Sequence, residues 1–113
     1  MKIDKGHVYL ADLNPRRGTE PGKVRPVVVV QTDLLNNIHP STVVCPITTN
    51  VIPGAEILRV HVSGRVSGLE APSDILVDQI RAIDNRRFIK RIGKLTPVQE
   101  QQLSSNLQTL ILL

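Results

Sequence analysis

The chain has 113 residues, enough for one modest hydrophobic core and too few for two, so we expect a single domain spanning residues 1–113. Aromatic residues make up only 2% of the chain, so the core must be built from Val, Ile and Leu, and stacking platforms for unpaired bases are nearly absent. The formal net charge of +4 fits an acidic partner, either a nucleic acid or an acidic polypeptide.

Cysteine and histidine usage predicts neither a disulfide nor a metal centre. Cys45 is the only cysteine, which excludes an internal disulfide, and its apolar neighbours indicate a buried residue rather than a nucleophile. His7, His39 and His61 lack metal-ligand spacing with one another or with acidic residues, so we predict no metal site and no cofactor. No signal peptide heads the chain and no apolar run approaches membrane length, so we expect a cytoplasmic protein with no membrane partner.

The hydrophobic pattern predicts a mainly β fold. Six segments are rich in β-branched residues or alternate apolar with polar residues, as strands do. In chain order they are Gly6–Leu13, Val24–Thr32, Ser41–Ile47, Glu56–Val62, Asp74–Ile83 and Phe88–Leu95. They predict a compact, strongly bent antiparallel sheet of five or six strands that approaches a small barrel, hence a β-barrel-like fold.

Three of these strands carry unusual residues. Val27–Val30 lacks polar alternation, so this strand is expected to be covered on both faces or closed into a small barrel. Pro46 cannot donate to a ladder, so the third strand is expected to be an edge, to contain a bulge or to end there. Asp78 and Gln79 fall inside the fifth predicted strand, where buried polar groups need partners.

A C-terminal helix follows the last strand. Thr96 provides an N-cap, Pro97 occupies the first helical position, and Gln99 completes a capping box. Four apolar residues then recur at helical spacing, so the helix is expected to close one side of the sheet. They are Leu103, Leu107, Leu110 and Ile111.

Arg25 is the most distinctive polar residue in the first half of the chain. Pro21 and Gly22 break regular structure before it, and Pro26 favours an extended conformation for Arg25 itself. Its side chain therefore leaves the backbone where a polar loop becomes a strand. Two readings remain open on these residues alone: Arg25 pairs with a neighbouring acid, or it binds an anion such as phosphate or carboxylate.

Three separated motifs occur together in this chain. They are GHVYLADLNPRRGTEPGKVRPVVVVQTD, PITTN and ILVDQIRAID, in that order. In this order they resemble the MazF/PemK/Kid family of toxin endoribonucleases, from about Gly6 to the terminal helix. The run from Gly18 to Val27 is the most specific part of the resemblance.

The resemblance implies a metal-independent, sequence-specific ribonuclease that cuts single-stranded RNA, usually mRNA, and arrests growth when its antitoxin is degraded. It implies an SH3-like barrel with a C-terminal helix, assembled as a homodimer. An acidic, partly disordered antitoxin would wrap that dimer and block the RNA groove. The positive charge suits both RNA and such an antitoxin.

Residue by residue, the resemblance makes Arg25 and Thr48 the catalytic pair. Glu20, Asp78 and Gln79 become candidates for acid/base or RNA-contacting roles, although a glutamine cannot act as a base. The remaining candidate RNA contacts are Thr19, Lys23, Thr49 and Arg81.

Several of these candidates also have a structural interpretation, and the chain departs from the family pattern at two positions. Glu20 can be a solvated surface acid, Asp78 a structural partner of Arg25 or Arg81, and Thr49 a turn former. Some family members carry a histidine where this chain has Thr19 and an arginine where it has Leu76, so their acid/base scheme does not transfer.

Base specificity is expected from the loop around Thr19 and the loop between Gly64 and Pro72. Two rival functions stay open. One is a non-enzymatic toxin that resembles the CcdB type and binds DNA gyrase, and the other is a plain SH3-like protein-binding module.

Overall fold

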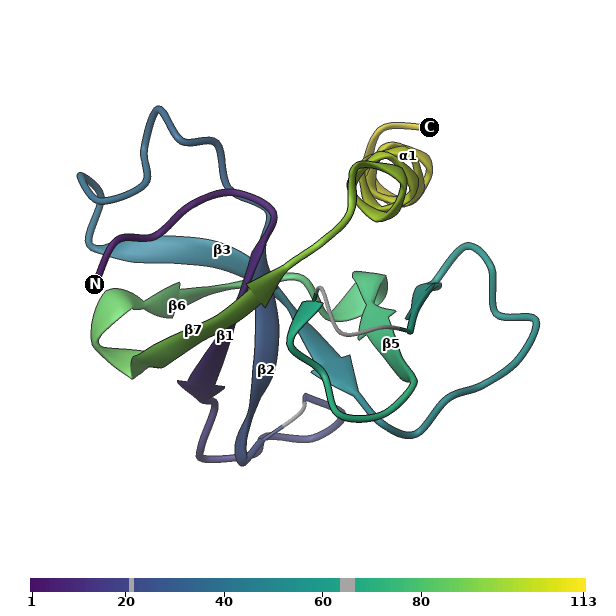
Figure 1. The fold of residues 1–113 in the computed structure, drawn as a ribbon, viewed down its shortest axis with the longest axis horizontal. Coiled ribbons are helices and arrows are strands. Elements are labelled where there is room, and N and C mark those ends of the chain that lie inside the picture. The colour runs from purple at the N-terminus through teal and green to yellow at the C-terminus, as the bar shows by residue number, and fades with distance from the viewer. Residues whose placement is uncertain (21, 64–66) are drawn as a thin grey trace.

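The computed structural model describes residues 1–20, 22–63 and 67–113. Pro21, expected to break the loop before Arg25, and Gly64, expected to begin the second specificity loop, lie outside the described residues. Seven strands, two short 3-10 helices and one α-helix follow one another along the described chain (Figure 1). They are β1 His7–Asp12, β2 Val24–Val29, β3 Ser41–Thr48, β4 Arg59–Val62, β5 Ser73–Leu76, η2 Val77–Gln79, β6 Arg81–Asp84, η3 Asn85–Arg87, β7 Phe88–Lys94 and α1 Pro97–Leu112.

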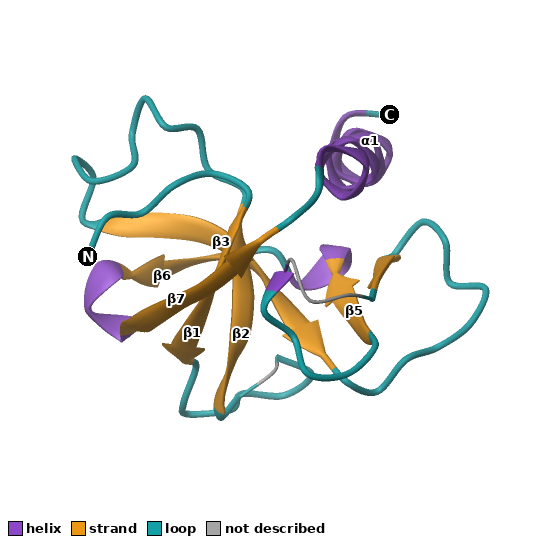
Figure 2. Cartoon of the chain, in the orientation of Figure 1, coloured by secondary structure: helices purple, strands orange, loops and turns teal. Residues whose placement is uncertain are grey.

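The strands form one bent antiparallel sheet in the order β4-β5-β3-β2-β1-β7, with β6 paired to β3 beside this path. Within the described residues, β4 and β7 end the order without pairing with each other, so the sheet is open rather than a closed barrel. The mainly β fold with a C-terminal helix is therefore confirmed. Figure 2 shows the helix standing to one side of the strands.

The predicted fifth strand consists of two strands, which explains why seven strands occur where five or six were expected. β5 ends at Leu76, the chain makes the 3-10 turn η2, and β6 starts at Arg81. Asp78 and Gln79 therefore lie in η2 and not inside a strand, as the alternating pattern had suggested. Asp78 is exposed and Gln79 half-buried, so neither is the fully buried polar group that was expected.

Pro46 lies in a central strand, and its position explains how β3 tolerates it. On one side β3 pairs with β2, where Val27 is opposite Pro46. On the other side β3 pairs with β6 up to Val44 and with β5 from Ile47 onward. The missing N–H thus falls where β3 changes partners, a place at which a ladder is interrupted in any case.

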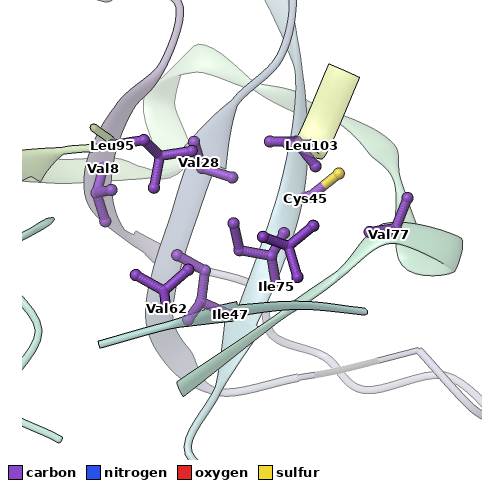
Figure 3. Packing of buried hydrophobic residues seen from close by; sticks show 10 residues of the cluster. Val8, Val28, Cys45, Ile47, Val62, Ile75, Val77, Leu95 and Leu103 are labelled. Atoms are coloured by element: carbon purple, nitrogen blue, oxygen red, sulfur yellow. The ribbon is translucent and has the colours of Figure 1, made fainter. Parts of the chain in front are cut away.

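The core consists of two clusters of buried apolar side chains, one on each face of β2. Val28 belongs to the cluster drawn in Figure 3, together with Cys45, Ile47 and Ile75. Val27 and Val29 point the other way, into a cluster with Tyr9 and other residues. Strand side chains alternate between faces, so the expectation that this valine run is covered on both faces is confirmed.

The helix α1 contacts β4 and η2, and its last turn extends beyond the sheet. Leu103 is buried and Leu107 packs against the core, whereas Leu110 is 37% and Ile111 56% exposed. The expected apolar stripe therefore leaves the sheet before the helix ends. Within the described residues, α1 and the shorter helical turns do not reach the length and hydropathy that a membrane crossing needs.

The capping box of α1 is formed as predicted, and its removal should destabilise the protein. Thr96 Oγ1 accepts from Gln99 N at 3.2 Å, and Gln99 Oε1 accepts from Thr96 N at 2.9 Å. Thr96→Ala is expected to lower the free energy of unfolding by about 1 kcal/mol, measured by urea denaturation. Ser105→Ala, on the exposed part of the same helix, is the matched control and should leave stability equal or slightly higher. Equal stability of both variants would contradict a role for the cap.

Candidate active site

The loop between β1 and β2 ends in a fixed conformation just before Arg25. Lys23 adopts a positive φ of 69°, its carbonyl accepts from Leu13 N, and its N–H donates to Asn14 Oδ1 at 2.8 Å. Arg25 then donates from Nε to Gly22 O at 2.9 Å. These bonds hold the base of the Arg25 side chain and leave the end of the guanidinium to other partners.

Arg25 carries a positive charge that no neighbouring acid neutralises. Among residues 1–20, 22–63 and 67–113, no carboxylate lies within 4.0 Å of its guanidinium, so the structural alternative of an ion pair finds no support there. Burial, with added repulsion from Arg16, lowers the pKa of Arg25 below its ordinary value. A half-buried cation of this kind is electrostatically prepared for an anion.

The β2–β3 register, extended past its last pair, indicates where Arg25 lies relative to Thr48. Val27 is paired with Pro46 and Val28 with Cys45, and continuing this register by two residues places Arg25 opposite Thr48. Directly opposed residues point to the same face, with Cβ atoms about 4.5–5.5 Å apart. Thr48 Oγ1 accepts from Asn50 N at 3.1 Å, so its hydroxyl proton remains available for donation.

Glu20 and Arg81, two further predicted site residues, face each other at the edge of this region. Glu20 Oε2 lies 3.9 Å from Arg81 Nη1, and the two side chains are 47% and 25% exposed. Arg81 is opposite Val44 in the register, on the same face of β3 as Thr48. The contact ties the β1–β2 loop to β6, although an exposed pair of this length contributes little stability.

The remaining predicted residues lie at the surface around the pair. Thr19, Lys23 and Thr49 are exposed, and Thr49 also accepts from Val51 N through its carbonyl, as a turn former does. Thr48 and Thr49 line a hollow of about 390 Å³ together with described residues of the second specificity loop. Asp78 has no ion pair with Arg25 or Arg81 in the described part of the chain, so the alternative of a structural pair with either arginine is not supported.

Sequence reasoning missed a charged cluster centred on Asp74, which is completely buried. Its Oδ1 lies 2.5 Å from His61 Nδ1, and its Oδ2 accepts from Ile52 N at 2.9 Å and from Arg59 Nη1 at 3.1 Å. Arg59 Nη1 also donates to Asn50 O at 2.7 Å. The sequence carries no sign that His61 and Asp74 are partners, because they are thirteen positions apart in the chain. The available sign was that Arg59 and His61 lie two positions apart in one strand, so both basic side chains project from the same face and need an acidic partner there.

Electrostatics of the cluster favour the ionised carboxylate. Burial alone raises the pKa of Asp74, but hydrogen bonds from Ile52 N, His61 and Arg59 outweigh it, so the pKa lies below its ordinary value. Asp74 therefore holds two basic side chains in place as a carboxylate. Across the described ranges, His, Cys, Asp and Glu side chains do not gather in threes as metal ligands would.

Comparisons with known proteins show what the whole chain is similar to. Residues 4–111 match the family model described as the PemK-like, MazF-like toxin of type II toxin–antitoxin systems. The chain is 36% identical over 108 residues to Endoribonuclease EndoA of Bacillus subtilis (strain 168), covering 96% of this chain and 93% of that protein.

Two solved structures from Deinococcus radiodurans share the fold. The crystal structure of MazF (Form-I) superposes with a TM-score of 0.84 at 21% identity and covers 98% of this chain and 97% of that chain. The MazE-MazF (Form-II) structure gives a TM-score of 0.77 at 21% identity, with 98% and 96% covered. The similarity in fold thus extends over nearly the whole length of each chain.

Proposed function

The chain belongs to the PemK-like, MazF-like toxins of type II toxin–antitoxin systems, and we propose that it is a sequence-specific endoribonuclease that cleaves single-stranded RNA without a metal ion. The relative EndoA is named as an endoribonuclease, and 36% identity over 96% of this chain supports the same activity here. The proposed target is mRNA, and the proposed consequence of cleavage is growth arrest.

One observation carries the proposal: within the described residues no acid neutralises the guanidinium of Arg25. The β2–β3 register supports it, because extending that register two residues beyond Val27–Pro46 would put Thr48 opposite Arg25. Arg25 offers a fork of donors that fits phosphate oxygens, and Thr48 offers a hydroxyl proton. Both side chains project from strands, so little rearrangement is needed when charge develops. A phosphodiester between them would receive donors from two sides.

The proposed reaction is attack by the ribose 2′-hydroxyl on the adjacent phosphorus. The 2′-oxygen loses its proton and forms a bond to phosphorus, the bond to the 5′-oxygen breaks, and that oxygen takes up a proton. The products are a 2′,3′-cyclic phosphate and a 5′-hydroxyl. Arg25 and Thr48 stabilise the charge that builds on the non-bridging oxygens, which is the preorganised electrostatics that accounts for much of enzymatic rate enhancement.

We assign the other predicted residues to proton transfer and RNA contact. Glu20, beside Arg81, is the candidate base, and Asp78 is the second candidate because it is exposed near the same region. Gln79 can hydrogen-bond a base edge through its amide. Thr19, Lys23, Thr49 and Arg81 are proposed to contact RNA from the exposed surface around the pair.

We further propose that the toxin acts as a homodimer and is neutralised by an acidic antitoxin. The MazE-MazF structure is a complex of a similar protein with its partner, and the net charge of +4 suits an acidic polypeptide. Apolar side chains at the end of α1 remain exposed, and a second copy of the toxin or the antitoxin would cover them. They include Ile111 at 56%, Leu112 at 80% and Leu113 at 99% exposure.

The test is cleavage of a long single-stranded RNA by the purified protein in EDTA. We expect cuts at a short recurrent sequence, mapped by primer extension. The new 5′ ends should accept phosphate from polynucleotide kinase without phosphatase treatment, because 2′-hydroxyl attack leaves a 5′-hydroxyl. Ends that carry a 5′-phosphate would refute this chemistry.

Cleavage that appears only after adding Mg²⁺ would refute metal independence. If the folded, antitoxin-free protein cuts no RNA, that result would favour the gyrase-binding alternative. That alternative is otherwise disfavoured, since the matching family model and the relative EndoA both point to RNA cleavage.

A further inference from the structure

The Asp74 cluster has no role in the cleavage proposed above, and its construction is costly. A fully buried carboxylate is stable only when its oxygens are well paired. Asp74 meets this need with three donors, from Ile52, Arg59 and His61. In proteins generally, a buried ion pair can often be replaced by apolar residues without loss of stability, so a functional reason for this cluster is worth seeking.

The register places this cluster in line with the catalytic pair. Thr48 is paired with Asp74 on β5, and Asp74 is paired with His61 on β4. Thr48, Asp74 and His61 thus form one row across β3, β5 and β4, and extending the β2–β3 register two residues beyond Val27–Pro46 continues this row to Arg25. Residues directly opposed in neighbouring strands share one face, so His61 lies on the same face as Arg25.

The imidazole of His61 is held at one nitrogen and open at the other. Nδ1 contacts Asp74 Oδ1, whereas the side chain as a whole is 42% exposed. With Nδ1 occupied, Nε2 is the nitrogen that a ligand can reach, and in the cationic ring it is a donor. Asp74 and Arg59 are the charged groups that share this cluster with His61. From α1, the neutral side-chain amide of Asn106 donates to the carbonyl of Arg59.

We propose that His61, held by Asp74, binds a phosphate of the RNA backbone adjacent to the one that is cleaved. This inference rests on the proposed function, because it assumes RNA on the face that carries Arg25 and Thr48. The ligand chemistry is a phosphodiester, which needs a directed donor with positive charge. The Asp74 carboxylate fixes the ring direction and balances its charge when no RNA is bound.

Distance along the sheet favours phosphate binding over proton transfer. His61 lies two strands beyond Thr48, and neighbouring strands are about 4.8 Å apart, so the two backbones are separated by roughly 10 Å. A general base must come within about 2.6–3.2 Å of the atom whose proton it takes. His61 is therefore placed for the next nucleotide along the strand rather than for the phosphate at Thr48.

The test measures binding of an RNA with a 2′-deoxy residue at the mapped cleavage position, over a range of salt concentrations. At about pH 5.5, His61→Gln should weaken binding about tenfold, because one donor to the phosphate is lost. It should also reduce the slope of log K against log salt by about 0.7, the contribution of one phosphate contact on single-stranded nucleic acid. The cleavage rate at saturating RNA should stay unchanged. Melting temperatures confirm that the variants are folded.

Two variants separate this role from a structural one. His61→Arg should restore the salt slope and keep it from about pH 5.5 to 8.5, because a guanidinium remains charged across that range. His39→Gln, at an exposed histidine between β2 and β3, should behave as wild type. Wild-type affinity and slope in His61→Gln would overturn the proposal. A fall in the saturating rate at unchanged affinity would overturn it in favour of proton transfer. If the wild type neither binds nor cuts RNA, the proposed function itself has failed.

Discussion

Replacing Arg25 with Ala is expected to lower the rate of RNA cleavage by about 10²–10³-fold, the usual effect of removing one preorganised donor from a developing oxyanion. The loss should appear in kcat, because the contact strengthens as charge builds in the transition state. Arg25→Lys should fall between wild type and Arg25→Ala, since a lysine keeps the charge and loses the planar fork. Initial rates on the mapped RNA sequence provide the measurement.

Stability supplies an independent control for this prediction. Burial and repulsion by Arg16 lower the pKa of Arg25, so the folded protein disfavours its charged form. Arg25→Ala should therefore melt at the same temperature as wild type or higher, which is the behaviour of a residue retained for function. Arg86→Ala removes an exposed arginine paired with Asp84 and is the matched control, with full activity expected. Wild-type cleavage by Arg25→Ala would remove Arg25 from the active site.

Combining a change at Thr48 with the change at Arg25 tests whether both residues contact the same phosphate. If Arg25 and Thr48 contact one phosphate, their effects on the rate should not be additive, because each single change already disturbs the shared contact. The double variant should then be less impaired than the product of the two single effects. Fully multiplicative losses would mean that the two residues act at separate places.

The elements that carry Arg25 and Thr48, the proposed catalytic pair, could be predicted in part from sequence because local signals agreed there. A valine run defines β2, Pro26 forces Arg25 into extended backbone, and the capping box defines the start of α1. The pairing of Arg25 with Thr48 could not be derived from pattern alone. It depends on the β2–β3 register, which is set by the fit of both strands into two cores.

The errors have a common physical origin. The segment containing Asp78 and Gln79 alternates as a strand does, but η2 turns the chain between partners on opposite parts of β3. Pro46 was expected to mark an edge, a bulge or a strand end, yet β3 is a central strand that continues past it to Thr48. In each case the decisive fact was which strand β3 pairs with, and that is a long-range property that no local window contains.

The buried Asp74 cluster leads to the largest stability effect that we expect. Asp74→Ala should lower the free energy of unfolding near neutral pH by about 3–5 kcal/mol, as the loss of one partner from a buried ion pair does. The change leaves the Ile52 N–H without its acceptor, and it leaves the Arg59 guanidinium without its carboxylate partner and with only Asn50 O. Urea denaturation gives the measurement. Asp84→Ala, which breaks the exposed pair with Arg86, is the control and should cost far less.

The pH dependence of stability gives a second test of Asp74 that survives if the alanine variant fails to fold. The folded pKa lies below the ordinary value of 3.8, so the carboxylate contributes stability above that pH and loses it as pH falls through the folded pKa. Asp74→Asn should be less stable than wild type near neutral pH, and the difference should shrink below about pH 4. A constant difference down to about pH 2 would show that folding does not lower the pKa of this carboxyl.

Stability and RNA binding should separate within the same cluster. Asp74 is completely buried and holds both basic partners, so its loss should impair folding and RNA affinity together. His61 is 42% exposed and contributes one of three bonds to Asp74, so His61→Gln should affect RNA affinity with little change in unfolding. A large loss of stability in His61→Gln would mean that the histidine serves the carboxylate, rather than the carboxylate positioning the histidine for RNA.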